Sequence, residues 1–195
     1  MGYLGKSLLG LGILLLGTLL TLRVTGLDPE YMDYTTEEYN QRGRMTWPGL
    51  WLEGEVVREP VENWDWVSDV NHPELGSTIM LETRTWYGIP HSVTILPTPR
   101  GDKFYIGGSA RGERLEREFP NFKRWWANVE RDPRVRLKID GKIYEMTAAL
   151  VNDPVELAEI IGRDPITTTV AEDGTQQIVA KWYYWRIYQR NIAQY

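Results

Sequence analysis

The chain has 195 residues, of which 42% are hydrophobic, and this is enough for one packed core of ordinary size. A net charge of -5 argues against nucleic-acid binding, which needs a basic surface to neutralise phosphates. The absence of cysteine excludes disulfides, thiolate nucleophiles and cysteine-ligated zinc. Nine tryptophans and eleven tyrosines suit either a small barrel core or the walls of a pocket for a planar ligand, and the core is the commoner role.

Residues 1–27 contain an uncharged apolar run between Lys6 and Arg23. As a helix rising about 1.5 Å per residue, this run is somewhat shorter than the roughly 30 Å hydrocarbon core, and the two flanking cations can lengthen it by snorkelling. We therefore expect residues 4–24 to anchor the protein in a lipid bilayer as a single span. A cleaved secretory signal is the alternative, and the balance of positive charge on the two sides leaves the orientation open.

Residues 28–49 are predicted to form an amphipathic juxtamembrane segment. Asp28-Pro29-Glu30 resembles a helix start, with a capping carboxylate followed by proline in the first turn. The aromatic residues around this segment suit the headgroup level of a membrane or a place under the barrel: Tyr31, Tyr34, Tyr39, Trp47 and Trp51.

Residues 50–195 predict one α+β domain, in which an antiparallel sheet curls into a barrel with two short flanking helices. Alternation of apolar and polar residues places Ile79, Leu81, Val135, Leu137 and Ile139 in the core and leaves Arg136 and Lys138 exposed. Helices are expected over residues 120–131 and 154–162, residues 97–101 are expected to form a turn, and residues 163–176 form a lid or a loop. Strands are expected over residues 50–58, 64–67, 77–86, 91–96, 103–107, 135–139, 143–151 and 178–188.

Conventional catalytic sets are missing from this sequence. Two histidines and no cysteine do not make the usual zinc sites, and Ser109 lacks the Gly-x-Ser-x-Gly elbow of a serine hydrolase. Hydroxyls, a guanidinium and the amides of a glycine-flanked loop could instead hold a phosphate-bearing cofactor. These groups occur in three segments, residues 83–85, residues 90–94 and the expected loop at residues 107–112.

The stretch ETRTWYGIPHSVTILPTPRGDKFYIGGSARG, followed by RWWANVERDPRVRLKIDGKIYEMTAALV, resembles the pyridoxamine-phosphate-oxidase-like FMN-binding split β-barrel superfamily. The resemblance is greatest to its deazaflavin-dependent nitroreductase branch, and it covers about residues 50 to 190. It implies that residues 88–91 open a strand lining the cofactor and that residues 109–112 bind the cofactor phosphate. The deazaflavin branch carries a basic run before the turn, whereas this chain has Arg84-Thr85-Trp86-Tyr87, so FMN, F420 and haem all stay open.

The resemblance implies a membrane-anchored flavin- or deazaflavin-dependent oxidoreductase that acts on a small or lipophilic acceptor such as a quinone. The cofactor would carry the chemistry, so no acid–base pair need be visible in the sequence. Relatives of this kind are typically homodimers, which implies a homodimer or a larger membrane complex. The alternative is a non-catalytic barrel that binds haem, a lipid or a partner membrane protein. The candidate cofactor-binding residues are Thr83, Arg84, Thr85, His91, Ser92, Val93, Ser109, Ala110, Arg111 and Trp125.

Overall fold

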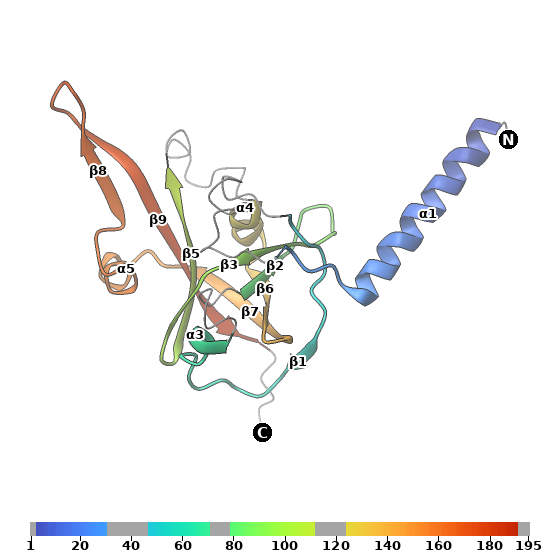
Figure 1. Ribbon diagram of the computed structural model, residues 1–195, viewed down its shortest axis with the longest axis horizontal. Coiled ribbons are helices and arrows are strands. Elements are labelled where there is room, and N and C mark those ends of the chain that lie inside the picture. Colours follow the sequence, from blue (N-terminus) through green and yellow to red (C-terminus); the bar gives the residue numbers. More distant parts are fainter. Residues whose placement is uncertain (1–2, 31–46, 71–78, 112–123, 191–195) are drawn as a thin grey trace.

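The computed structural model describes residues 3–30, 47–70, 79–111 and 124–190. Helix α1, Tyr3–Thr25, extends away from the rest of the protein (Figure 1). Among the described residues, one helical segment has the length and composition to cross a membrane. It is Gly5–Thr25, with 21 residues and a mean hydropathy of 2.0, and a signal sequence would have the same properties. The hydroxyls of Thr18, Thr21 and Thr25 donate to carbonyls one turn earlier, so these side chains keep few polar atoms free.

The body is built on one sheet with the strand order β3-β2-β6-β7-β9-β5-β4. Neighbouring strands along this path are antiparallel, β1 pairs in parallel with β7, and β8 pairs with β9. The described helices of the body are α3 (Val67–Val70), α4 (Arg124–Arg131) and α5 (Pro154–Ile161). The strands are β1 (Glu55–Val57), β2 (Ile79–Thr83), β3 (His91–Ile95), β4 (Pro97–Arg100), β5 (Lys103–Arg111), β6 (Arg134–Ile139), β7 (Lys142–Leu150), β8 (Ile166–Val170) and β9 (Gln176–Gln189).

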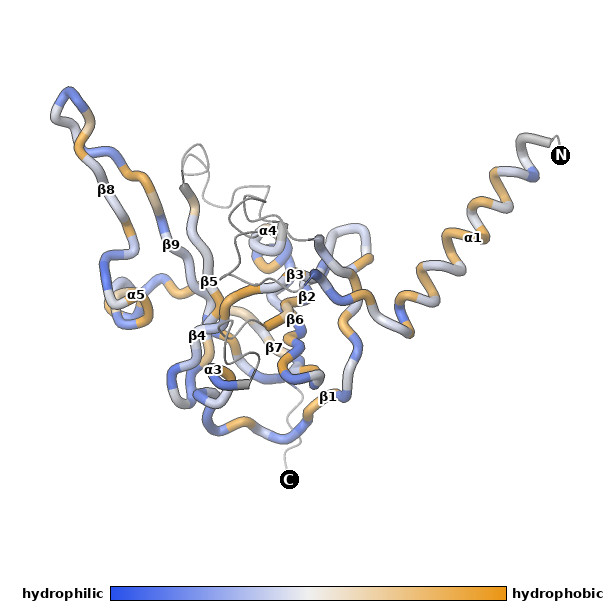
Figure 2. The backbone as a smooth tube through the Cα atoms, viewed as in Figure 1, coloured by the Kyte–Doolittle hydropathy of each residue, from blue (hydrophilic) through white to orange (hydrophobic). Residues whose placement is uncertain are grey.

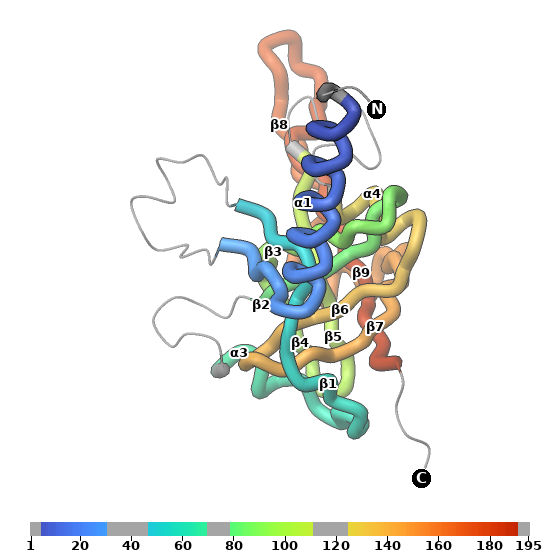
Figure 3. The backbone as a smooth tube through the Cα atoms, turned by 90° about the vertical axis from the view of Figure 1, so that its right-hand side faces the viewer, coloured from blue at the N-terminus to red at the C-terminus, as the bar shows by residue number. Residues whose placement is uncertain are grey.

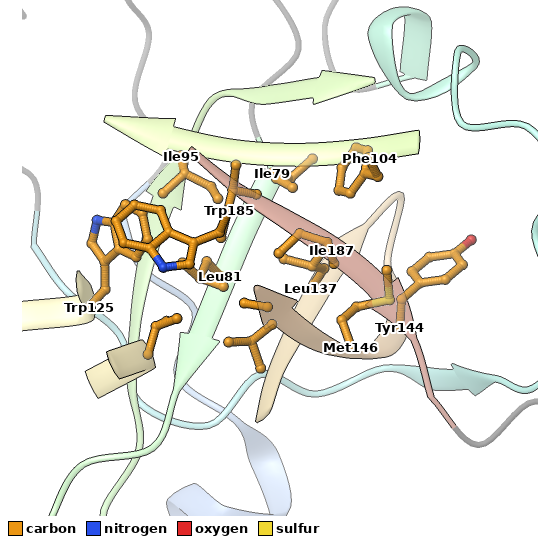
Figure 4. Close-up of a cluster of buried hydrophobic side chains, with 14 of the residues drawn as sticks. Ile79, Leu81, Ile95, Phe104, Trp125, Leu137, Tyr144, Met146, Trp185 and Ile187 are labelled. Atoms are coloured by element: carbon orange, nitrogen blue, oxygen red, sulfur yellow. The ribbon is translucent and has the colours of Figure 1, made fainter. Parts of the chain in front are cut away.

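The sheet curls because strands from its two ends contribute to a single core. Ile79 and Leu81 of β2 share this core with Phe104 of β5, although three strands lie between β2 and β5 in the sheet order. Side chains from β2, β5, β6, β7, β9 and α4 point into the same space (Figure 4). This curled antiparallel sheet with flanking helices confirms the predicted α+β barrel.

Several local predictions are confirmed. Asp140 and Gly141 have φ angles of 48° and 72°, as the two-residue turn between β6 and β7 requires. Asp153 caps α5 by accepting a hydrogen bond from the Val155 N–H at 3.0 Å, and Gly162 ends the helix in the left-handed region. The predicted core residues of β2 and β6 are buried. The first part of the helix predicted over residues 120–131 lies outside the described residues, and α4 accounts for the rest.

Four predictions of local secondary structure in the body are wrong. Residues 97–100 form β4 instead of a turn, because an edge strand tolerates the missing N–H groups of Pro97 and Pro99. Residues 107–111 continue β5 instead of leaving it as a loop, because Gly107 makes room for the ring of Tyr184 on β9. Residues 64–67 form a turn leading into α3, and residues 166–170 of the expected lid or loop form β8.

The side chains of Arg136 and Lys138 are half-buried, which corrects the prediction that they are exposed. Arg136 pairs with Glu82 at 3.1 Å, and Lys138 pairs with Asp28 at 2.5 Å. Lys138 contacts Asp28 and Arg136 contacts the Leu52 carbonyl, so the segments that follow α1 cover both cations.

Residues 26–30 run as an extended segment beside residues 47–51. The Leu27 N–H donates to the Trp51 carbonyl and the Leu50 N–H donates to the Leu27 carbonyl, both at 2.8 Å. Gly49 in turn exchanges two backbone hydrogen bonds with Ser92 of β3, at 2.9 and 3.0 Å. The segment that follows α1 is therefore attached to an edge strand of the sheet. The helix start predicted at Asp28-Pro29-Glu30 is wrong, because residues 26–30 are extended and hydrogen-bond to residues 47–51. Residues 31–46, the rest of the predicted juxtamembrane segment, lie outside the described residues.

Candidate cofactor cleft

An open cleft lies where the end of β2 meets the junction between α4 and β6. Its volume is about 590 Å³, within the range of roughly 300–1,000 Å³ that is common for small-molecule sites. Three guanidinium groups against one carboxylate give the cleft a net charge of +2. Such a site suits an anionic ligand. The lining residues are Arg84, Thr85, Trp86, Arg131, Asp132, Pro133 and Arg134.

The hydrogen bonds of Arg131 join the end of α4 to the end of β2. Its Nη2 donates to the Arg84 carbonyl at 2.6 Å and to the Asn128 side-chain oxygen at 3.0 Å. The Asn128 amide is buried and donates to the Thr83 hydroxyl at 2.9 Å. This chain of contacts fixes the guanidinium of Arg131 before any ligand arrives, which lowers the entropic cost of binding.

Asp132 orients a second arginine of the cleft. Arg134 donates to both carboxylate oxygens of Asp132, at 2.8 and 2.6 Å, and the Arg134 backbone N–H donates to one of them at 3.1 Å. These hydrogen bonds from Arg134 lower the pKa of Asp132 to about 2. Arg84 lies 4.0 Å from the same carboxylate. Asp132 therefore stays ionised near neutral pH and holds the cations together at the cleft.

Trp86 gives the cleft an aromatic wall. Its side chain is 79% exposed and meets Tyr87 edge-on, with the ring centroids 5.3 Å apart. Thr85 closes the turn by donating its hydroxyl to the Ile89 carbonyl. A large exposed indole beside fixed guanidinium groups can stack on a planar ring whose charged group lies among the arginines.

Six of the predicted site residues come together in the β2–β3 part of the sheet. Arg84 and Thr85 line the cleft, while Thr83 is buried below it and accepts the Asn128 hydrogen bond. The register pairs Thr83 with His91, Glu82 with Ser92, and Leu81 with Val93. His91, Ser92 and Val93 therefore lie on β3, which pairs with β2 beside the cleft. They do not line the cleft itself.

The other four predicted residues lie elsewhere. Ser109, Ala110 and Arg111 are in β5, opposite Trp182, Lys181 and Ala180 of β9. Ala110 is fully buried, and Trp125 packs in the core with its ring 5.0 Å from that of Trp185. The side chain of Arg111 lies outside the described part of the chain, so its contact with a cofactor phosphate stays a prediction.

Sequence reasoning missed the half of the cleft that α4 and β6 supply. Arg131, Asp132 and Arg134 were interpreted only as the end of a helix and the start of a strand. The available signal was the run of charges in Glu-Arg-Asp-Pro-Arg directly after an aromatic helix. Among the described residues, no group of three or more histidine, aspartate or glutamate side chains is placed to hold a metal ion.

No protein-family model matches the sequence, and no match to a curated protein was found. Three solved structures are similar. A candidate pyridoxamine 5'-phosphate oxidase from Listeria innocua is 15% identical, with 58% of this chain and 83% of that chain covered and a TM-score of 0.37. A conserved hypothetical protein from Mycobacterium tuberculosis is 14% identical, with 69% and 86% covered and a TM-score of 0.36. A pyridoxamine 5'-phosphate oxidase-related, FMN-binding protein from Nostoc punctiforme is 10% identical, with 57% and 71% covered and a TM-score of 0.30. These TM-scores are low, so the fold assignment rests on the strand pairing within this chain.

Proposed function

We propose that this protein is a membrane-anchored oxidoreductase that binds a phosphate-bearing flavin in the cleft between β2, α4 and β6. The observation that carries the proposal is the cleft itself, with a net charge of +2 and a volume of about 590 Å³ beside an exposed tryptophan. Helix α1 would hold the barrel at the membrane, where lipophilic electron acceptors such as quinones are found.

The residues of the cleft fit a flavin mononucleotide in two respects. Arg131 is held in place and, with Arg84, offers N–H groups that can bind phosphate oxygens, while the Nε and Nη2 of Arg134 already donate to Asp132 and add positive charge. Trp86 presents a flat apolar surface of the kind that a fused ring system stacks on. F420 and haem also carry anionic groups, and the single cation in residues 84–87 favours FMN over the deazaflavin.

A bound reduced flavin would supply two-electron hydride transfer to a lipophilic acceptor such as a quinone, with one proton from solvent. The chain's own residues bind and orient. The arginines hold the phosphate, Trp86 fixes the plane of the ring, and the Asn128–Thr83 contact keeps α4 and β2 in register around the cleft. Because the cofactor would supply the redox chemistry and the protein binds and orients it, no acid–base side chain is required. A homodimer stays a prediction of the family resemblance.

The test is a fluorescence titration of FMN, and separately of riboflavin, into the full-length protein in detergent. Riboflavin lacks the phosphate, so it reports ring binding alone. A charge-assisted hydrogen bond contributes about 1.5–3 kcal/mol, so Arg84→Ala and Arg131→Ala should each weaken FMN binding by roughly ten- to a hundredfold. Riboflavin affinity should stay close to that of the wild type.

Arg58→Ala is the matched control, because Arg58 is an exposed arginine away from the cleft. It should leave both affinities unchanged. Equal FMN affinity in the wild type and both cleft variants would contradict the proposal. Arg111→Ala in the same titration tests whether β5 also contributes to phosphate binding. Parallel titrations with F420 and haem determine whether either replaces FMN.

A further inference from the structure

We propose that the turn between β2 and β3, which carries Trp86 and Tyr87, lies in the headgroup layer of the bilayer that holds α1. The cleft would then open at the membrane surface, where a lipophilic acceptor can reach it without crossing water. This inference rests on the proposed function in one respect, the anchoring of α1 in a membrane. It does not depend on which cofactor the cleft binds.

The first support is the way the exit of α1 is attached to the sheet. The Thr94 hydroxyl of β3 donates to the Glu30 carbonyl at 2.9 Å, and Asp28 forms an ion pair with Lys138 of β6 at 2.5 Å. Together with the Gly49–Ser92 pair, these contacts attach the segment after α1 to β3. Strand β3 begins at His91, immediately after the turn, so the turn and the exit of α1 lie at neighbouring positions on one edge of the body.

The second support is the placement of the turn relative to the helix axis. In Figure 1, α1 leaves the body and continues past the side on which the loop between β2 and β3 projects. The view rotated by 90° also shows this side of the body beside the path of α1 (Figure 3). A bilayer that surrounds α1 would therefore meet the turn before it meets the β4–β5 end of the body.

The third support is the chemistry of the exposed side chains. Trp47, at the exit of α1, is 75% exposed, Trp86 is 79% exposed and Tyr87 is 50% exposed. The hydropathy colouring shows that α1 is rich in hydrophobic residues along its length (Figure 2). Rings with an apolar body and a polar tip are favoured at the membrane–water interface, and the arginines of the adjacent cleft suit the level of the lipid phosphates. In contact with the lipid headgroup layer, these aromatic rings would bury apolar surface that is otherwise exposed to water.

The chain has no cysteine, so one labelled cysteine can report on one position at a time. Three variants of the full-length protein, Tyr87→Cys, Leu15→Cys and Asp102→Cys, are labelled with a fluorophore and reconstituted in vesicles of phosphatidylcholine with some phosphatidylglycerol. Leu15 lies within α1, and Asp102 is exposed at the β4–β5 turn. Quenching is measured with lipids brominated near the headgroup and along the acyl chain, and with iodide in the water.

We expect the Tyr87 label to be quenched by lipid brominated near the headgroup and the Leu15 label by lipid brominated along the chain. The Asp102 label should respond to iodide alone. If the Leu15 label is quenched by lipid while the Tyr87 label behaves like the Asp102 label, the inference about the turn is overturned and the anchor stands. A Tyr87 label that neither lipid nor iodide reaches also overturns it and indicates a protein contact. If lipid does not quench the Leu15 label, both the anchor and this inference are wrong.

Discussion

Glu82 of β2 connects the segment at Leu52 to the neighbouring strand β6. Its side chain is 9% exposed and accepts hydrogen bonds from the Leu52 N–H at 2.6 Å and from Arg136 at 3.1 Å. Arg136 also donates to the Leu52 carbonyl at 3.0 Å. Burial raises the pKa of Glu82, and the Leu52 and Arg136 contacts oppose this rise. The three groups form one unit, so removing one of them leaves the others with unpaired polar atoms.

We expect Glu82→Ala to lower the free energy of unfolding by about 3 kcal/mol, because it leaves a half-buried guanidinium without its carboxylate. The measurement is urea denaturation of the full-length protein in detergent. Glu55→Ala is the matched control, since Glu55 is an exposed acid on β1 and should change stability by less than about 0.5 kcal/mol. Similar losses in the two variants would show that the Glu82 contacts contribute little.

The lowered pKa of Asp132 predicts how the stability of the protein changes at acidic pH. The folded value is about 2 against 3.8 in the unfolded chain, so the contribution of Asp132 to stability is complete above pH 3.8 and is lost as pH falls toward 2. The wild type should therefore be more stable than Asp132→Asn at neutral pH, and this difference should close below pH 3.8. Thermal melts of both proteins across this pH range give the difference in stability at each pH. Both proteins contain Glu82, so its titration affects them equally and does not contribute to this difference. A difference that stays constant with pH would contradict the assignment.

At the scale of elements, the contact between the segment after α1 and the sheet depends on Gly49. A Cβ atom at this position would collide with the Leu27 carbonyl oxygen, and would lie 2.5 Å from both the Pro29 nitrogen and the Ser92 hydroxyl. Only glycine allows the two backbones and β3 to approach this closely. The sequence places Gly49 two residues after a tryptophan, which gave no reason to expect this role.

Gly49→Ala should lower the free energy of unfolding by about 1–3 kcal/mol, because two pieces of backbone must move apart to admit the methyl group. Gly17→Ala is the control, since nothing lies within 4 Å of the added methyl group in α1. It should not destabilise the protein. Urea denaturation in detergent compares the two, and equal stability of both variants would show that the segment is not tightly attached.

Period-two alternation identified the strands that face the core, because β2, β6 and β7 pack one side against a single cluster and burial then follows sequence parity. It missed β8, whose residues are exposed on both faces and whose order comes from pairing with β9 alone. It also missed β4, where two prolines indicate a turn in sequence but are tolerated at a sheet edge. Both strands pair with the next strand along the chain, Val170 with Gln176 and Arg100 with Lys103, but neither alternates between buried and exposed residues, so alternation did not indicate them.

The same limit applies to the candidate site at the scale of the whole molecule. The half of the cleft on β2 was predictable because Arg84 and Thr85 follow a clear strand and precede a Gly-Ile-Pro turn. The half on α4 and β6 joins it only because β2 pairs with β6 and Asn128 contacts Thr83 across 45 positions of sequence. Spacing along the chain does not show that proximity. The role of β5 stays a prediction from family resemblance.

The absorbance spectrum of the purified protein shows whether the barrel holds a flavin-type cofactor. Full-length protein is extracted from membranes in detergent, purified, and scanned in the visible range before and after adding FMN and removing the excess. We expect a flavin band that stays with the wild-type protein after this removal and that is strongly reduced when Arg84 and Arg131 are both replaced by alanine. A wild-type protein that remains colourless after exposure to FMN would show that the barrel does not hold this flavin.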